Sequence, residues 1–422
     1  MAAFSPLDPT SLPGTAGLAE ARARALARFL DGPLPSQTEE IWRYSRVDEL
    51  DPGRFRPADP DLTAPVPPAV DRVLDLIGAR SGLAVTVDGA LITTEQGAPG
   101  LQVRPAADGD EIGVLTAAAD PWDAFVELNT AQAPVPLVIE IAADTVVDDP
   151  VVVCHWSGGD ATVTFPRSLI RVGANARGTV VEYHLSADVA AWADPVVEVE
   201  LADGAHLDHL IVQELGTRMW QTAYNTYRVG RDASLRTYTV ALGGDYARVR
   251  TDSTIVGAGG EAQLAALYSG DGTQMHDFRT LQDHLGPKST SDLFFKGAVA
   301  GDARSAYSGL IRVRRGAVGT RAFQTNRNLV LSDTGLATYS VPNLDIEESD
   351  VSCSHASATG PIDPDQRFYL ESRGVPPEVA ERLIVLGFFD DLLARLPVPA
   401  LRHHLGSLLS EKLALDEGGD RD

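Results

Sequence analysis

The sequence predicts a mainly β protein, with a right-handed parallel β-helix core between α-helical N-terminal and C-terminal regions. Short β-rich runs separated by Gly, Asp and Ala turns fill residues 83–345. Long amphipathic helical patterns are missing between these runs, which argues against alternating β–α units. An apolar residue that follows a small turn recurs at a nearly constant spacing. We therefore expect an N-terminal helical region and linker at 1–82, the β-helix core at 83–360 and a C-terminal helical region at 361–422.

The recurring apolar residues give the length of the repeat. They are Val180, Leu207, Leu235, Leu264 and Leu293, separated by 27, 28, 29 and 29 residues. Because a strand averages about 5–6 residues, a repeat of about 28 holds two or three strands and their bends. Such a unit is one coil of a solenoid, which buries its face only by stacking on the next coil. The core then has room for roughly nine coils. A β-sandwich array is the alternative, with less regular turns.

Helical patterns precede the core. Residues 15–31 place apolar side chains on one face and end at Gly32-Pro33, which predicts an amphipathic helix. Residues 38–50 predict a second helix with Thr38 as its N-cap. A linker rich in Pro and Asp follows at 51–70.

Three helices are predicted after the core. The first is capped by Asp363, carries Pro364 in its first turn and stops at Gly374. The second spans 376–396 and has a long apolar face, and the third spans 397–415.

Composition narrows the function. The formal net charge of −24 and pI near 4.7 disfavour nucleic acid and anionic lipid as partners. No apolar run approaches the roughly 20 residues of a spanning helix, and the N-terminus has no secretory signal. With only two cysteines, we expect a cytoplasmic protein that needs no disulfides. The phosphate-binding loop and the H-E-x-x-H, G-x-S-x-G and C-x-x-C motifs are absent.

The two cysteines each have a histidine close by, which raises the question of a metal site. Cys154 precedes His155, and Cys353 lies two residues before His355. The two pairs are about seven coils apart, or more than about 30 Å at about 4.8 Å per coil. This separation excludes a shared metal ion and a disulfide. We expect Cys154 to be a buried small hydrophobe.

Cys353 and His355 share one face of a strand with Val351, because side chains alternate along a strand. One interpretation places all three in the core of the last coil. The other notes that the last coil has an unpaired edge, so that Cys353 and His355 face a partner chain. Two side chains do not complete a metal site, so a metal there would need ligands from that partner.

Four stretches resemble a known family. Residues 40–50, 324–333, 342–375 and 378–389 are similar to the SufB/SufD family of iron–sulfur cluster assembly proteins. The resemblance is diffuse in the repeats and specific near both ends of the chain.

Within that family the chain resembles the SufD type. Arg327 stands where SufB proteins carry a cysteine, and Ala356 stands where SufB has an acid after the histidine. Residues 353–360 resemble the SufD run C-S-H-G-A-T-V-G: Cys353, Ser354, His355 and Gly360 coincide with it, and Ala356 stands at the place of its first glycine.

The resemblance implies a non-catalytic scaffold subunit of a SufBCD complex. Its partners would be SufB, the SufC ATPase and a cysteine desulfurase system, with a homodimer when the chain is isolated. ATP hydrolysis would belong to SufC. The isolated chain would hold no tightly bound cofactor, whereas the complex would carry a transient iron–sulfur cluster or iron.

The resemblance also implies the site residues. His355 is the candidate ligand for the cluster or for iron at the SufB interface, and Cys353 is a second candidate. The residues expected to face SufC are Tyr369, Arg373, Gly374, Gly387 and Phe388. Two alternatives remain open: a homodimeric SufB-like scaffold, which Arg327 disfavours, and a β-helix carbohydrate-active enzyme, which would need clustered acids on one exposed sheet.

Overall fold

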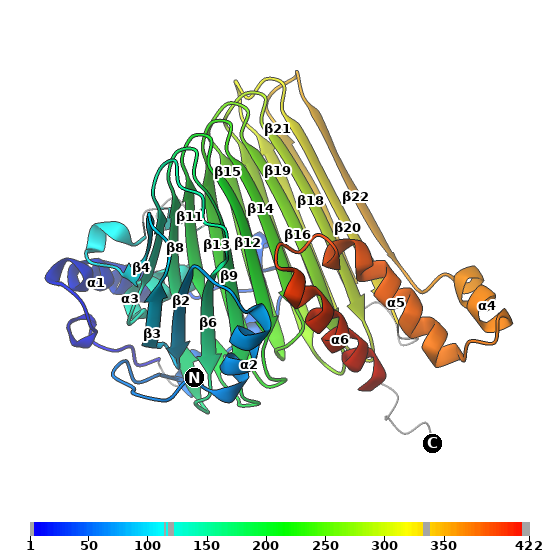
Figure 1. Cartoon of the computed structure of the whole chain (residues 1–422), viewed down its shortest axis with the longest axis horizontal. Helices are drawn as coiled ribbons and strands as arrows, with labels where there is room; N and C mark the ends of the chain where they lie inside the picture. The colour runs from blue at the N-terminus through cyan, green and yellow to red at the C-terminus, as the bar shows by residue number, and fades with distance from the viewer. Residues whose placement is uncertain (1–3, 114, 117–121, 332–337, 416–422) are drawn as a thin grey trace.

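The core is a parallel β-solenoid whose coils each add one strand to two facing sheets (Figure 1). The computed structural model describes residues 4–113, 115–116, 122–331 and 338–415, so the ends of both predicted terminal regions lie outside it. The first sheet stacks β5 (Leu137–Ile141), β8 (Arg167–Val172), β11 (Val196–Leu201), β13 (Trp220–Val229), β15 (Tyr246–Ile255), β17 (Met275–His284), β19 (Arg304–Val313) and β21 (Thr338–Ile346). The second sheet stacks β6 (Val151–Ser157), β9 (Arg177–Ser186), β12 (His206–Glu214), β14 (Ser234–Ala241), β16 (Glu261–Gly270), β18 (Thr290–Val299), β20 (Arg321–Val330) and β22 (Ser352–Gly360).

These pairs of strands make eight coils, one fewer than predicted. The difference lies at the start of the core. There, β2 (Gly82–Val87) pairs antiparallel with β3 (Ala90–Gln96), and β4 (Leu101–Pro105) pairs antiparallel with β5. These strands close the first coil, and they were counted as solenoid because their composition is equally β-rich.

The predicted repeat aligns only some coils correctly. Leu207 pairs with Leu235 as expected, but Val180 pairs with His209, two residues beyond Leu207. Leu235 likewise pairs with Ala262, two residues before Leu264. Since side chains alternate along a strand, a two-residue shift keeps each residue on the same face. The repeat therefore identified the inward face while misplacing the register.

The start of the solenoid is covered by two helices that pack on each other. The predicted N-terminal helix is confirmed as α1 (Ala16–Asp31), with Thr15 as its N-cap. Its Arg22 is fully buried and donates hydrogen bonds to the carbonyls of Ala133 and Pro134, both at 2.9 Å. The second helix, α3 (Ala124–Gln132), was not predicted, because all of its residues are buried and it has no polar face to give a helical pattern.

The predicted helix at 38–50 is wrong. The segment forms two short 3-10 turns, at Glu40–Trp42 and Val47–Glu49, and Thr38 caps neither of them. Between them Tyr44 has φ +66°, which no helix accommodates. Trp42 is buried beneath the guanidinium of Arg248, 3.7 Å from its ring centre. The long-range packing of Trp42 thus determines the conformation of this segment, in place of the helix that the local sequence pattern predicts.

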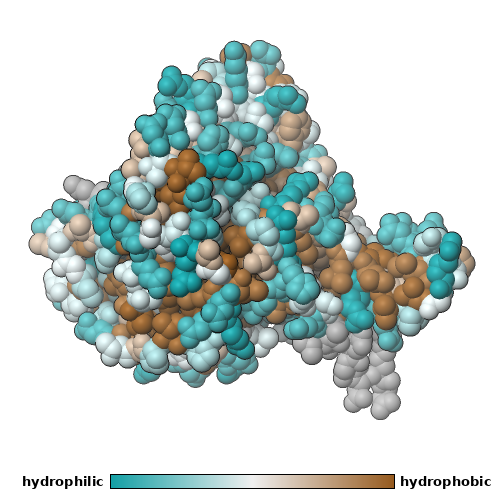
Figure 2. Space-filling view, viewed as in Figure 1, coloured by the Kyte–Doolittle hydropathy of each residue, from teal (hydrophilic) through white to brown (hydrophobic). Residues whose placement is uncertain are grey.

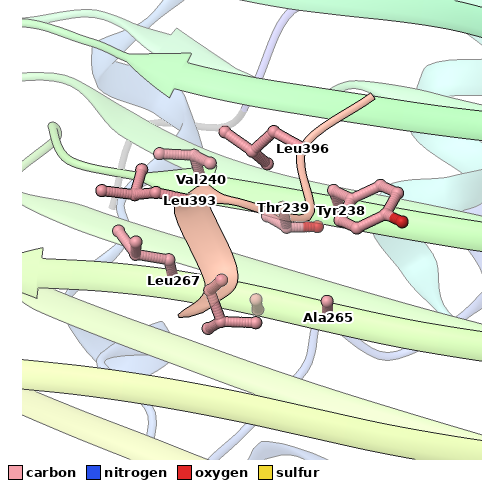
Figure 3. A pocket seen from close by; sticks show the side chains of 9 residues that line it. Tyr238, Thr239, Val240, Ala265, Leu267, Leu393 and Leu396 are labelled. Carbon is pink, nitrogen blue, oxygen red and sulfur yellow. The ribbon is translucent and has the colours of Figure 1, made fainter. Parts of the chain in front are cut away.

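Helices also cover the outer face of the second sheet (Figure 1). They are α2 (Pro68–Ile77), α5 (Pro377–Leu393) and α6 (Pro399–Leu415), while α4 (Pro364–Ser372) stands apart at the right of the view, beyond α5. The predicted linker at 51–70 therefore runs into α2, whereas the three C-terminal helices are confirmed. Leu393 and Leu396 pack against Val240 and Leu267 of the sheet (Figure 3). This contact anchors the helices to the solenoid.

Three remaining strand pairs are short. β1 (Arg56–Pro57) pairs with β7 (Thr162–Thr164), β7 pairs with β10 (Trp192–Ala193), and β10 joins the first sheet by pairing with β13. Among the described helices, none is long and apolar enough to cross a membrane.

Candidate functional site

The solenoid ends in two strands that have a neighbour on one side only. Within the residues that the structure describes, β21 pairs with β19 alone and β22 pairs with β20 alone. Most side chains of β22 are exposed as a result. The last coil thus presents unpaired backbone groups on both sheets, which is the usual template for adding a strand from another chain.

His355 lies at this open end on a ladder of inward-facing side chains. It pairs with Gln324, which pairs with Leu293, which pairs with Leu264. Those three side chains are all at most 1% exposed, whereas His355 is exposed. The imidazole therefore occupies a luminal position that is open only because no further coil covers it.

Cys353 occupies the preceding position of the same face and is more enclosed. It packs with Val351 against a small cluster at the end of the lumen that includes Ile311 and Ala322. Partial burial raises the pKa of the Cys353 thiol. Without a partner chain the thiol is therefore held protonated, and it becomes a good metal ligand only when a cation displaces its proton.

The first cysteine is remote from this end. Cys154 lies in β6, seven strands from β22 in the same sheet, and it is fully buried beneath the outer helices. The predicted separation and the prediction of a buried hydrophobe are confirmed, and neither cysteine forms a disulfide.

Arg327 lies one coil before the open end and points outward. It is exposed, while its neighbours Asn326 and Asn328 are buried in the lumen and bonded to each other. The side chain at this position therefore provides no thiol, and its guanidinium lies outside the lumen.

The helices after β22 form an arm that begins three residues beyond the open strand. Asp363 caps α4 through a hydrogen bond from the Asp365 amide at 2.9 Å, and the helix is followed by Gly374 at φ +85°. Tyr369 is 57% exposed, and the guanidinium of Arg373 lies 5.2 Å from the centre of its ring. This part of the arm faces solvent.

An open groove runs between α5 and α6. Gly387 lines it, and apart from the neighbouring backbone of its own helix no described atom lies within 4 Å of where a Cβ on Gly387 would be. The other lining residues include Leu383, Leu386, Asp390, His403 and Gly406. Figure 2 shows apolar side chains gathered over α5 and toward α4, where Phe368, Tyr369 and Leu383 are the large exposed hydrophobic residues.

Phe388 differs from the other predicted contact residues. It is half-buried and packs edge-to-face on Phe389 with ring centres 5.1 Å apart. Its carbonyl accepts a hydrogen bond from the buried Lys296 of β18 at 2.6 Å. Phe388 therefore helps to attach the arm to the solenoid, a role that its sequence context did not indicate.

Sequence comparison decides the family. Residues 155–388 match the family model described as SUF system FeS cluster assembly, SufBD core domain. The chain belongs to the SufBD family. The predicted family membership is thus confirmed, and the chain is a SufBD-family iron–sulfur cluster assembly protein.

Individual relatives agree with this membership over most of the chain. An iron–sulfur cluster assembly SufBD family protein of Mycobacterium tuberculosis is 34% identical over 419 residues, covering 96% of each chain. The iron–sulfur cluster assembly protein SufD of Escherichia coli is 24% identical over 400 residues, covering 92% of this chain and 91% of that one. SufD of Bacillus subtilis is 29% identical over 273 residues, covering 63% of this chain and 62% of its own.

The groove between α5 and α6 was only partly anticipated. Gly387 was selected from the family resemblance, but the opposite wall, with His403 and Gly406, was not. The pattern of α6 gives no reason to single out either residue, because which side of the helix is open depends on how it packs against α5.

Proposed function

We propose that this chain is the SufD-type subunit of a SufBCD complex, in which an iron–sulfur cluster is assembled at its interface with SufB. The observation that carries the proposal is the position of His355, a luminal side chain exposed at the open end of the solenoid. Neutral imidazole is a suitable ligand for iron, and it binds less tightly than a thiolate. A scaffold has to release its cluster, so a weaker ligand suits this role.

The open strands supply the means of pairing with SufB. Strand addition uses backbone groups and so needs no particular sequence, while the alternating side chains set the register. Arg327 gives no thiol near this end, which favours a partner that brings its own cysteine over a homodimer working alone. Cys353 is the second candidate ligand, available where the partner or a cation displaces its proton.

The arm formed by α4, α5 and α6 is the proposed docking site for the SufC ATPase. It offers an exposed apolar surface and an open groove, and it continues directly from β22. Movement of the arm would therefore act on the strand that carries His355. In this arrangement ATP hydrolysis takes place in SufC, and the chain itself acts as a scaffold.

The proposal is tested by His355→Ala in a complex reconstituted with SufB and SufC. Because His355 is exposed, the variant should assemble and unfold like the wild-type chain, while the yield of cluster measured by visible absorption and iron content should fall several-fold. Ser354→Ala, on the opposite face of the same strand, is the matched control and should keep the wild-type yield. An unchanged yield in His355→Ala would overturn the ligand role.

A further inference from the structure

The lumen of the early coils holds a buried group of metal-binding side chains, far from the open end. Its members are His155 of β6, Glu182 and His184 of β9, and His209 of β12. Each is at most 4% exposed. From β9 to β22 is six coils, or about 29 Å at about 4.8 Å per coil, so this group is separate from His355.

The group has the arrangement of a coordination site. His155 pairs with His184 in the neighbouring coil, and their rings stack with centres 4.9 Å apart. One ligand atom from each of His155, Glu182 and His184 lies within 4.8 Å of the others. Oε1 of Glu182 lies 3.9 Å from Nε2 of His209. None of these separations is a hydrogen bond.

Hydrogen bonds occupy the same nitrogen, Nδ1, in two of the rings. Thr86 Oγ1 lies 2.8 Å from Nδ1 of His155, and the Tyr227 hydroxyl lies 2.9 Å from Nδ1 of His209. Metal-binding histidines are commonly oriented in this way, by a hydrogen bond to the nitrogen that does not bind the metal.

Polar atoms of three of these side chains are left without partners. Nε2 of His155, Nε2 of His209 and Oε1 of Glu182 are buried and have no hydrogen bond within the described part of the chain. Three such atoms in one group of side chains are costly unless something satisfies them. Another luminal histidine of this chain shows the contrast, since both ring nitrogens of His284 are 2.8 Å from serine hydroxyls.

We propose that His155, Glu182 and His184 bind a divalent transition-metal ion such as Zn²⁺ or Fe²⁺ inside the solenoid. His209, whose Nε2 lies near Oε1 of Glu182, either joins the ion or fixes the carboxylate. Two imidazoles and a carboxylate are a common ligand set for both metals.

The spacing of the group fits this occupant. Ligand atoms around a zinc ion with bonds of about 2.1 Å lie about 3.4 Å apart, which small ring rotations would reach. The ion would join adjacent coils from within, and it would enter as the chain folds.

The test uses the full-length chain, unfolded with a chelator and refolded with or without Zn²⁺. We expect about one Zn²⁺ per chain after gel filtration, measured by mass spectrometry of the metal, and a higher thermal midpoint than for the metal-free chain. Refolding with Co²⁺ should give visible absorption from the bound ion. Sub-stoichiometric zinc together with equal midpoints would overturn the site.

Variants separate this site from the open end. His355→Ala should keep the ion, whereas Glu182→Gln combined with His184→Gln should lower zinc affinity about tenfold or more. His284→Gln is the matched control, a buried luminal histidine outside the group, and should keep the ion. Equal loss of zinc in the control would overturn the assignment. If the double variant does not refold, the thermal midpoint of the His355→Ala chain is compared with and without Zn²⁺. A midpoint that zinc still raises supports the site, and equal midpoints would overturn it.

Discussion

Lys296 in β18 donates a hydrogen bond to Asp391 in α5 at 2.7 Å, and the two residues join the solenoid to the helical arm. The lysine side chain is only 7% exposed, against 46% for the aspartate. Its ammonium also lies 5.1 Å from the ring centre of Phe294 and 4.8 Å from that of Phe388. Both hydrogen-bond acceptors of this buried ammonium, the Asp391 carboxylate and the Phe388 carbonyl, therefore belong to the docked arm.

Lys296→Met should loosen the arm without disturbing the solenoid. The variant loses the hydrogen bonds to Asp391 and to the Phe388 carbonyl, and we expect a cost of about 1–3 kcal/mol in the stability of the α5–α6 unit. Hydrogen exchange should speed up in α5 and α6 and stay unchanged in β12. Lys288→Met, at an exposed turn, is the control. Equal exchange in both variants would show that the ion pair does not hold the arm.

Much of the architecture was predictable because the same local sequence pattern recurs in each coil. Alternating side chains and small turns predict strands and their inward face, and terminal signals such as Asp363 and Gly374 predict where helices begin and end. What failed were features set by distant packing. The turn at Tyr44 and the buried helix α3 both depend on contacts with residues far away in the sequence.

The candidate functional residues likewise include some that the sequence predicts and some that it does not. His355 was identifiable from its place in the last strand and from the family resemblance, and the structure adds the luminal ladder that ends with it. The buried histidines were not identifiable. His155 and His209 are 54 residues apart in the sequence, and only the coil register and the turn lengths bring both near Glu182.

Gly387→Leu should block the groove without harming the fold. Apart from the neighbouring backbone of its own helix, nothing described lies within 4 Å of the added Cβ, and replacing a helical glycine gains about 0.8 kcal/mol of helix propensity. Binding of SufC, measured by calorimetry, should weaken at least about tenfold if the groove is its docking site. Gly387→Ala gains similar propensity with little volume and should bind normally. Full affinity in Gly387→Leu would move the SufC contact elsewhere. A deletion of the arm is less informative, since it would expose the outer face of the sheet.

His284 should make the protein less stable as the pH falls. Burial lowers its folded pKa to about 4, against a small opposing effect of Asp283, while the unfolded value is about 6.5. Between these values the unfolded chain binds more protons, so the free energy of unfolding decreases as the pH drops from 6.5 toward 4. In His284→Gln this dependence should be weaker by at most about 1.4 kcal/mol per pH unit. Urea unfolding at several pH values measures how the free energy of unfolding changes with pH. The same change with pH in the variant and the wild type would contradict the expectation.

Ser357→Lys should prevent the open end from pairing with a SufB chain. Ser357 is exposed, lies on the luminal face of β22 opposite Asn326 of β20, and bonds to Ser340 across the last coil at 2.7 Å. An inward-pointing charge at an edge strand opposes the addition of another coil, because the partner would bury it. Since the site is exposed in the single chain, we expect its stability to change by no more than about 0.5 kcal/mol. Native mass spectrometry of co-expressed subunits should show the complex lost in Ser357→Lys and retained in Ser354→Lys, on the outward face of β22. If Ser357→Lys pairs as well as the wild-type chain, the luminal face of β22 is not the contact with SufB, and His355 would have no partner opposite it.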